Sequence, residues 1–224
     1  MCEEALQEIL ARIKATPLGN AAYRAARELL DLIGPDGCTR LTVGELADLT
    51  GMRFAFGKNI DLQGGDYGNA LLSRFPIVSE GNRHLERVGG GEQRGVLQTV
   101  LEIAGRRVLV LTTHFDHRRD SAQRPRSADE MREMAAQWGD GPLVMLGDFN
   151  DVPDSPAHRT LTQVARDAWV AVGKGDGFTI PVDTPRRRID WVLLRGLTPT
   201  DAEVVRTDGS DHLPVVVTAT LDAK

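Results

Sequence analysis

The chain contains two apolar runs that each end in polar residues, Val108-Leu-Val-Leu-Thr-Thr-His-Phe-Asp116 and Leu143-Val-Met-Leu-Gly-Asp-Phe-Asn150. Short runs rich in valine, leucine and threonine are typical of strands. Successive side chains of a strand point to opposite faces, so residues i and i+2 share a face. The first strand therefore delivers His114 and Asp116 to one face of its end, and the second delivers Asp148 and Asn150 in the same manner.

Two further strands carry polar residues at their start. Asp190 precedes Trp191-Val-Leu-Leu194, and Ser210-Asp211-His212 leads into Leu213-Pro-Val-Val-Val217. If the four strand ends share one rim of a sheet pair, they form a cluster of oxygen ligands and imidazoles. Such a cluster suits a hard divalent cation and a phosphate ester, and its members are Asp116, Asp148, Asp190, Asp211, Asn150, His114 and His212.

These residue types meet the needs of phosphodiester hydrolysis. The reaction needs a base for water, donors around the phosphate oxygens and a group that steadies the leaving oxygen. An aspartate can hold the water, an asparagine can orient it, and a histidine can donate to phosphate oxygens. Each residue alone has a plainer interpretation, because aspartate and asparagine after a strand often form turns and a histidine is often a half-buried structural residue. The interpretation as a site depends on the four strand ends occurring together.

The remaining sequence patterns predict an α+β fold with many strands. The predicted helices are a hairpin over 3–33, a helix from the capping box Thr42/Glu45 to Gly51, a helix capped by Ser127 and Glu130 through Trp138, and a helix opening at Ser155-Pro156. The predicted strands cover 54–56, 69–75, 95–103, 107–113, 142–147, 189–194, 202–206 and 214–221, with a tight turn at Ala104-Gly105. If these strands pair as two packed sheets, we expect burial of Leu109, Leu111, Leu143, Met145, Val192, Leu194, Val215 and Val217.

Composition and length bound the class of protein. The chain has 224 residues, of which 41% are hydrophobic and 26% charged, as in an ordinary globular domain and unlike a disordered or coiled-coil chain. Its longest apolar runs are too short to cross a bilayer. The pattern changes near residue 37, so we expect an atypical helical segment over 1–37 and a strand-rich domain over 38–224.

Charge and cysteine content favour a cytoplasmic protein. The formal net charge is −5, whereas a non-specific nucleic-acid binder usually carries a net positive charge. Two cysteines form no C-x-x-C pair, and the acidic start Met1-Cys-Glu-Glu4 is unlike a secretory signal. One group of arginines can either line a rim that attracts phosphate or form a solvated surface: Arg118, Arg119, Arg124, Arg126 and Arg186 to Arg188.

The polar strand ends belong to five ordered motifs: Tyr67-Gly-Asn-Ala-Leu-Leu-Ser-Arg-Phe-Pro-Ile77, Thr113-His-Phe-Asp116, Gly147-Asp-Phe-Asn150, Arg188-Ile-Asp-Trp-Val192 and Ser210-Asp-His-Leu-Pro214. In order and spacing they resemble the motifs of the endonuclease/exonuclease/phosphatase superfamily. The resemblance implies a four-layer α/β sandwich, in which two mixed sheets pack face to face with helices outside. It also implies Mg²⁺- or Mn²⁺-dependent hydrolysis of a phosphoester, whether nucleic acid, nucleotide, inositol phosphate or phospholipid headgroup.

The resemblance further implies a role for each residue of the predicted site. Asp148 would activate water, Asn150 would orient the phosphate, and His114 would contact phosphate oxygens. Asp190 would pair with His212, His212 would stabilise the transition state, and Asp211 would help hold the metal.

The first residues depart from the family pattern. Family members open with a strand ending in Asn and a second ending in Gln-Glu, whose Glu is the principal metal ligand, whereas residues 1–37 indicate helices. The nearest match, Leu6-Gln-Glu-Ile9, places Glu8 off the apolar stripe and thus on a solvated helix face. Two functions stay open: an active metal-dependent phosphoesterase, or an impaired or truncated member that binds a ligand or partner without efficient turnover.

Overall fold

The computed structural model describes residues 42–223 except Asp120 and Asp208. The hairpin predicted over 3–33 and the boundary predicted near residue 37 lie outside these described residues. The described part is built around a six-stranded sheet in the order β3-β4-β5-β6-β8-β7. Its strands are β3 (Ile77–His84), β4 (Gly95–Ile103), β5 (Arg106–His114), β6 (Leu143–Asp148), β7 (Arg166–Asp167) and β8 (Asp190–Arg195). Within it β5 and β6 run parallel, and the other neighbours pair antiparallel.

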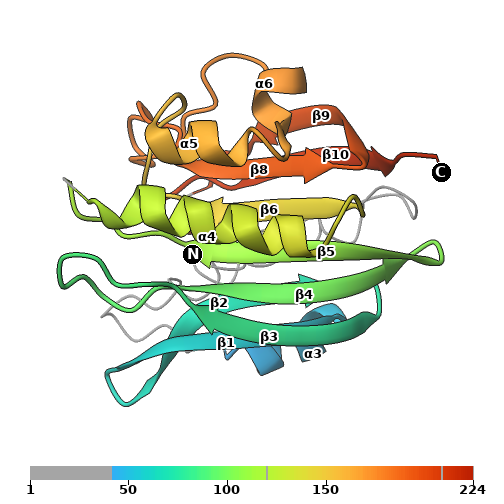
Figure 1. Ribbon diagram of the computed structural model, residues 1–224, viewed down its shortest axis with the longest axis horizontal. Helices are drawn as coiled ribbons and strands as arrows, with labels where there is room; N and C mark the ends of the chain where they lie inside the picture. Colours follow the sequence, from blue (N-terminus) through green and yellow to red (C-terminus); the bar gives the residue numbers. More distant parts are fainter. Residues whose placement is uncertain (1–41, 120, 208, 224) are drawn as a thin grey trace.

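Two antiparallel strand pairs pack on one face of this sheet, and helices pack on the other (Figure 1). The pairs are β1 (Arg53–Leu62) with β2 (Gly65–Ser73) and β9 (Leu197–Val204) with β10 (Val215–Leu221). Helices α4 (Gln123–Gln137) and α5 (Pro156–Leu161) cover the opposite face, while α3 (Val43–Thr50) contacts β1 and α6 (Ala168–Val172) contacts β9. One mixed sheet, two antiparallel strand pairs and flanking helices agree with the predicted α+β class.

The central strands are apolar on both faces, because each face has its own core. Val108 and Val110 of β5 join the core against the strand pairs, whereas the alternate Leu109 and Leu111 join the core against the helices. β6 divides its side chains in the same way. Of the eight residues predicted to be buried, seven are buried and Val215 is partly buried. The predicted burial is confirmed for those seven residues, but because both faces of these strands are buried, burial alone does not test the predicted register.

The local predictions differ in accuracy according to the signal behind them. The bounds of β4 match the prediction, and Ala104-Gly105 forms the predicted turn with positive φ at both residues. β3 was not predicted, because its Ser-Glu-Gly-Asn-Arg stretch is mostly exposed and lacks an apolar pattern. The predicted start of α4 at Ser127 is wrong: the helix begins at Gln123, and its early Pro125 is tolerated where backbone N–H groups have no helical partner.

No helix in the part of the chain described here is long and apolar enough to cross a membrane.

A buried ionic cluster joins the start of β8 to α5 and α6. Arg188 donates to Asp167 at 2.9 and 3.2 Å, and the Nε2 of His158 lies 2.8 Å from the same carboxylate. The carboxylate also caps α6 by accepting the backbone N–H groups of Trp169 and Val170. Burial by itself would raise the pKa of Asp167, but the hydrogen bond from His158 and the charge of Arg188 hold that pKa below its usual value.

We expect Asp167→Asn to lower the free energy of unfolding by about 3–5 kcal/mol, because Arg188 would stay buried without its charge partner. Stability from a carboxyl group with a lowered pKa is complete above its ordinary pKa of 3.8 and is lost as the pH falls through the folded-state pKa. Urea unfolding should therefore show the full difference between variant and wild type at neutral pH and a smaller one below about pH 4.

Asp201→Asn is the matched control, since Asp201 is an exposed aspartate on β9. Its effect should stay within about 0.5 kcal/mol. A loss for Asp167→Asn no larger than this control would contradict the structural role of the buried cluster.

Candidate active site

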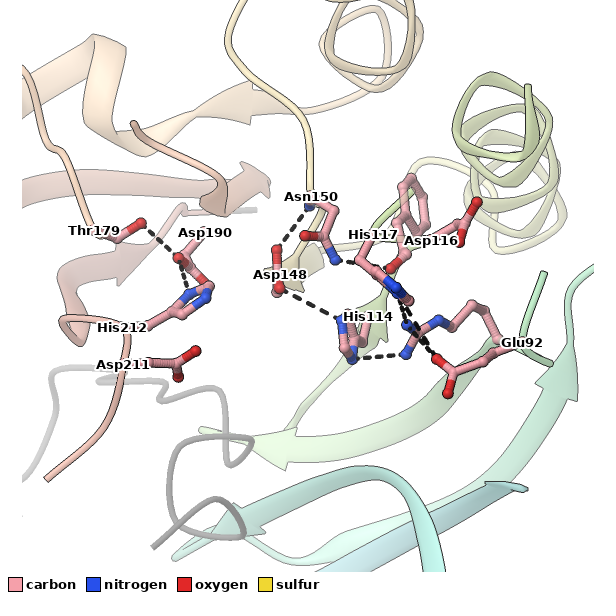
Figure 2. A network of polar contacts seen from close by, with 12 residues as sticks. Glu92, His114, Asp116, His117, Asp148, Asn150, Thr179, Asp190, Asp211 and His212 are labelled. Carbon is pink, nitrogen blue, oxygen red and sulfur yellow. Dashed lines mark hydrogen bonds and ion pairs between the residues drawn. The ribbon is translucent and has the colours of Figure 1, made fainter. Parts of the chain in front are cut away.

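Three neighbouring strands place three polar side chains in one row at the edge of the sheet. The parallel pairing of β5 with β6 sets His114 opposite Asp148, and the antiparallel pairing of β6 with β8 sets Asp148 opposite Asp190. The Nε2 of His114 lies 3.5 Å from Asp148 Oδ2 (Figure 2). Residues that are 34 and 42 positions apart in the chain thus become direct neighbours.

A row of aromatic residues supports this polar row from the helix side. Phe115, Phe149 and Trp191 each follow one member of the polar row, so their side chains point to the opposite face. Phe149 stacks on Trp191 at 4.5 Å between ring centroids, and Phe115 meets Phe149 edge to face at 5.1 Å. All three rings are buried in the core beneath α4 and α5. Packing of the aromatic rings therefore fixes the position of the polar row.

Local backbone geometry explains the Gly147-Asp-Phe-Asn150 motif. A Cβ on Gly147 would lie 1.9 Å from the carbonyl oxygen of Thr113 on β5, so only glycine allows the two strands to approach this closely. Asn150 has a φ of 50°, in the left-handed region that asparagine tolerates better than most residues. Its backbone N–H donates to Asp148 Oδ1 at 2.7 Å, and its side-chain amide donates to Phe115 O at 3.0 Å.

Asp190 and His212 form the predicted pair. His212 Nδ1 lies 2.8 Å from Asp190 Oδ2, and the same oxygen accepts a hydrogen bond of 2.6 Å from the Thr179 hydroxyl. The Thr179 carbonyl also accepts the Leu213 N–H at 2.8 Å, which ties the loop of His212 to the loop of Thr179. His212 and Thr179 are buried, so the Asp190 carboxylate is held by a buried imidazole and by a buried hydroxyl.

Asp148, Asp190 and His212 make up a possible metal site. One ligand atom of each lies within 4.8 Å of the others. Asp211, the predicted metal ligand, is exposed and does not belong to this group, although it adjoins His212 (Figure 2). The possible metal site therefore consists of three residues that were predicted to be catalytic, and it does not include Asp211, which was predicted to bind the metal.

Asp116 lies outside the cluster in which the sequence placed it. Its carboxylate is fully buried and accepts hydrogen bonds from Ser121 and from Arg118 Nε, the latter at 2.8 Å. Burial opposes ionisation, but these hydrogen bonds outweigh it and hold the pKa of Asp116 below its usual value. Asp116 therefore anchors the loop that leads to α4.

The arginines of the predicted rim are mostly paired with carboxylates. The pairs are Arg118 with Asp116, Arg124 with Asp151, Arg126 with Glu86 and Arg188 with Asp167. Arg119, Arg186 and Arg187 are exposed. The rim thus carries less free positive charge than the count of its arginines indicates.

The sequence patterns did not single out three residues of the site. Thr179 lies in a loop with no recognisable motif, and Tyr67 was noted only as the start of a longer run. Its hydroxyl lies 3.1 Å from His114 Nδ1. Arg94 is buried at the start of β4 and donates to the same Nδ1 at 3.0 Å. A charged residue directly before a buried strand was the signal that could have identified Arg94.

A cavity of about 500 Å³ lies beside the Asp190–His212 pair. Its wall includes Phe178 and Leu213, the chain neighbours of Thr179 and His212. Thr179 and His212 turn toward Asp190 instead. The cavity therefore adjoins the candidate active site but is not the place where its polar side chains meet.

Comparisons with known proteins agree with this geometry. The profile of the endonuclease/exonuclease/phosphatase family matches residues 5–212. The uncharacterized protein YbhP of Escherichia coli is 34% identical over 179 residues, which cover 76% of this chain and 69% of YbhP.

Two solved structures share the fold. The mannosyl-6-phosphatase Bt3783 of Bacteroides thetaiotaomicron matches with a TM-score of 0.76 at 17% identity, covering 98% of this chain and 91% of its own. The human Nocturnin catalytic domain with a bound sulfate anion matches with a TM-score of 0.73 at 19% identity, covering 97% of this chain and 86% of its own. Together with the profile match and the ordered motifs, these likenesses lead to one conclusion: the chain belongs to the endonuclease/exonuclease/phosphatase family.

Proposed function

We propose that this protein is a divalent-metal-dependent phosphoester hydrolase, acting on a phosphodiester with Mg²⁺ or Mn²⁺. The observation that carries the proposal is the row of His114, Asp148 and Asp190, closed by His212 at 2.8 Å from Asp190. A base, hydrogen-bond donors and carboxylate ligands meet at one edge of the sheet, as hydrolysis at phosphorus requires.

Each residue of the row has a role that follows from its contacts. Asp148 accepts the proton of the attacking water, since its carboxylate is held in place by the Asn150 N–H and by His114. As the new P–O bond forms, His114 donates a hydrogen bond to a phosphate oxygen, and the P–O bond to the leaving group breaks while the charged His212 gives its proton to the leaving oxygen, which departs as an alcohol. Asp190 orients His212 and favours its charged form, because an anion next to an imidazole stabilises the cation.

The donor set suits a hard divalent cation. The cation would be held by the carboxylate oxygens of Asp148 and of Asp211, which is next to His212 in the chain, because Asp190 and His212 act as a hydrogen-bonded pair in the reaction proposed above. A bound divalent cation would polarise the phosphate oxygens and add positive charge.

The substrate is best described as a small phosphoester. Long duplex DNA binds through many unpaired cations, whereas four arginines of the rim are already paired with carboxylates. A nucleotide, an inositol phosphate or a phospholipid headgroup needs fewer such contacts than a nucleic acid. The name of one structural relative, a mannosyl-6-phosphatase, also points to a small phosphoester.

One observation favours a second candidate function, that of a family member that binds a ligand or partner without efficient turnover. Within the described residues, the possible metal group holds two aspartates and a histidine, and no glutamate. The principal metal ligand implied by the family resemblance is a glutamate.

We expect the purified protein to hydrolyse bis-p-nitrophenyl phosphate with added Mg²⁺ or Mn²⁺ and to lose this activity in EDTA, because the two carboxylates favour a hard cation. The measurement is the release of p-nitrophenol, with isothermal titration of Mn²⁺ into the protein alongside. Equal activity in EDTA would refute the dependence on metal. Binding of Mn²⁺ without any hydrolysis would favour the second function.

Asp190 and His212 should act as one unit. Asp190→Asn and His212→Ala should each reduce kcat by more than about tenfold, while the double variant should be little worse than His212→Ala alone. Asp190 works through its hydrogen bond to His212, so removing it has no further effect once the imidazole is gone.

Asp140→Asn is the matched control here and should keep wild-type kcat, since its side chain is exposed after α4 and does not line the cavity. Far-UV circular dichroism must be unchanged in every variant. Additive losses from the two active-site substitutions would show that the residues act independently.

A further inference from the structure

We propose that Arg94 is a positioning residue that fixes the tautomer of His114 and His117, so that each ring carries its hydrogen on Nε2 and presents it as a donor. This inference rests on the proposed function for its effect on catalysis, but its structural basis is independent of any activity. Arg94 donates to one ring nitrogen of each histidine.

The chemistry of the guanidinium group decides the tautomer. An arginine has five N–H donors and no acceptor. Arg94 Nη1 lies 3.0 Å from His114 Nδ1, so this Nδ1 must offer its lone pair and cannot carry a hydrogen. The Tyr67 hydroxyl, 3.1 Å from the same atom, can then act only as a second donor. The ring hydrogen of His114 is thereby placed on Nε2, the nitrogen that faces Asp148.

The same reasoning applies to His117. Arg94 Nη2 lies 3.1 Å from His117 Nδ1 and 2.8 Å from Glu92 Oε2. The His117 side chain is 62% exposed, whereas that of Arg94 is 3% exposed. A buried guanidinium thus bridges a buried and an exposed imidazole, and both rings direct their Nε2–H groups away from it.

The cost of burying Arg94 argues for a role beyond stability. Among the described residues, its one carboxylate partner, Glu92, is half exposed, and its Nε has no hydrogen-bond partner. A buried charge with incomplete pairing destabilises a fold relative to apolar residues of similar size. Two of its hydrogen bonds end on imidazoles, which an apolar replacement would leave unoriented.

The backbone on both sides of Arg94 is held by hydrogen bonds. The Arg94 carbonyl accepts the Leu85 N–H at 2.9 Å. The Gly95 carbonyl accepts the Asn69 side-chain amide and the Thr113 hydroxyl, each at 2.9 Å. These hydrogen bonds fix the backbone from which the Arg94 side chain extends. A fixed backbone is what a residue that orients its neighbours requires.

The tautomer of His114 determines which residue accepts a proton in the proposed reaction. With its hydrogen on Nε2, His114 can donate to a phosphate oxygen but cannot take a proton from water through that nitrogen. The base is then Asp148, the carboxylate that accepts the Asn150 N–H at 2.7 Å.

The test is a long-range ¹H–¹⁵N correlation spectrum of the full chain labelled at its five histidines. His114→Gln and His117→Gln assign the two rings. In the wild type we expect the pattern of an unprotonated Nδ1 and a protonated Nε2 for both rings. A protonated Nδ1 at His114 overturns the proposal, and this result needs no substrate.

Arg94→Met and Arg94→Lys extend the test to activity. Arg94→Met removes the donors, so the His114 pattern should shift to a mixture of tautomers, and kcat should fall about 10–100-fold, as for other residues that orient a catalytic ligand. Arg94→Lys keeps the charge but cannot bridge two rings in a fixed plane, so it should restore activity only in part. An unchanged His114 pattern in a folded Arg94→Met protein contradicts the proposal.

Arg132→Met is the matched control, because this partly exposed arginine on α4 pairs with Asp129 and has no contact with either histidine among the described residues. It should leave the spectra and kcat unchanged. The spectra also separate the two proposals: the expected tautomers in a protein without any hydrolysis would refute the proposed function alone, whereas hydrolysis with a protonated Nδ1 at His114 would refute the role of Arg94 alone.

Discussion

The candidate active site depends on the register in which β5, β6 and β8 pair. This register sets His114 beside Asp148 and Asp148 beside Asp190 at one edge of the sheet. A slip of one residue would turn each of these side chains into the core and bring the following aromatic residue to the edge. The stacked Phe149 and Trp191 and the close contact of Gly147 with Thr113 oppose such a slip, because both fit one alignment of the strands.

The carboxylates near this edge fall into two groups that differ in their partners. Asp116 and Asp167 are buried and bind arginines, so their charges are balanced and they act as anchors for loops and helices. Asp148 and Asp190 accept hydrogen bonds from a backbone N–H, a hydroxyl and imidazoles. The fold thus places the carboxylates that anchor loops and helices apart from the carboxylates of the candidate active site.

Much of the fold was predictable, because the central strands have strong local signals. Valine and leucine runs in β4, β5, β6 and β8 reflect burial on both faces, which is the condition under which residue type follows structure most closely. β3 was not predicted because most of its side chains face solvent, where polar residues are tolerated. The start of α4 was misplaced because Ser127 and Glu130, which have the spacing of a capping box, lie inside the helix and are buried.

The sequence by itself determined the identity of the polar residues at the strand ends and the apolar strands that carry them. His114, Asp148, Asp190 and His212 follow or precede runs whose pattern is local, and a local pattern can be read along the chain. Only the tertiary structure decided which carboxylates remain at the edge: Asp116 pairs with Arg118 two residues along the chain, whereas Asp148 lies beside His114, 34 positions away. Arg94 and Thr179 likewise acquire their roles from contacts with residues 11 to 23 positions away. The energy of such contacts depends on distances in space, which the folded core sets and the order of residues does not.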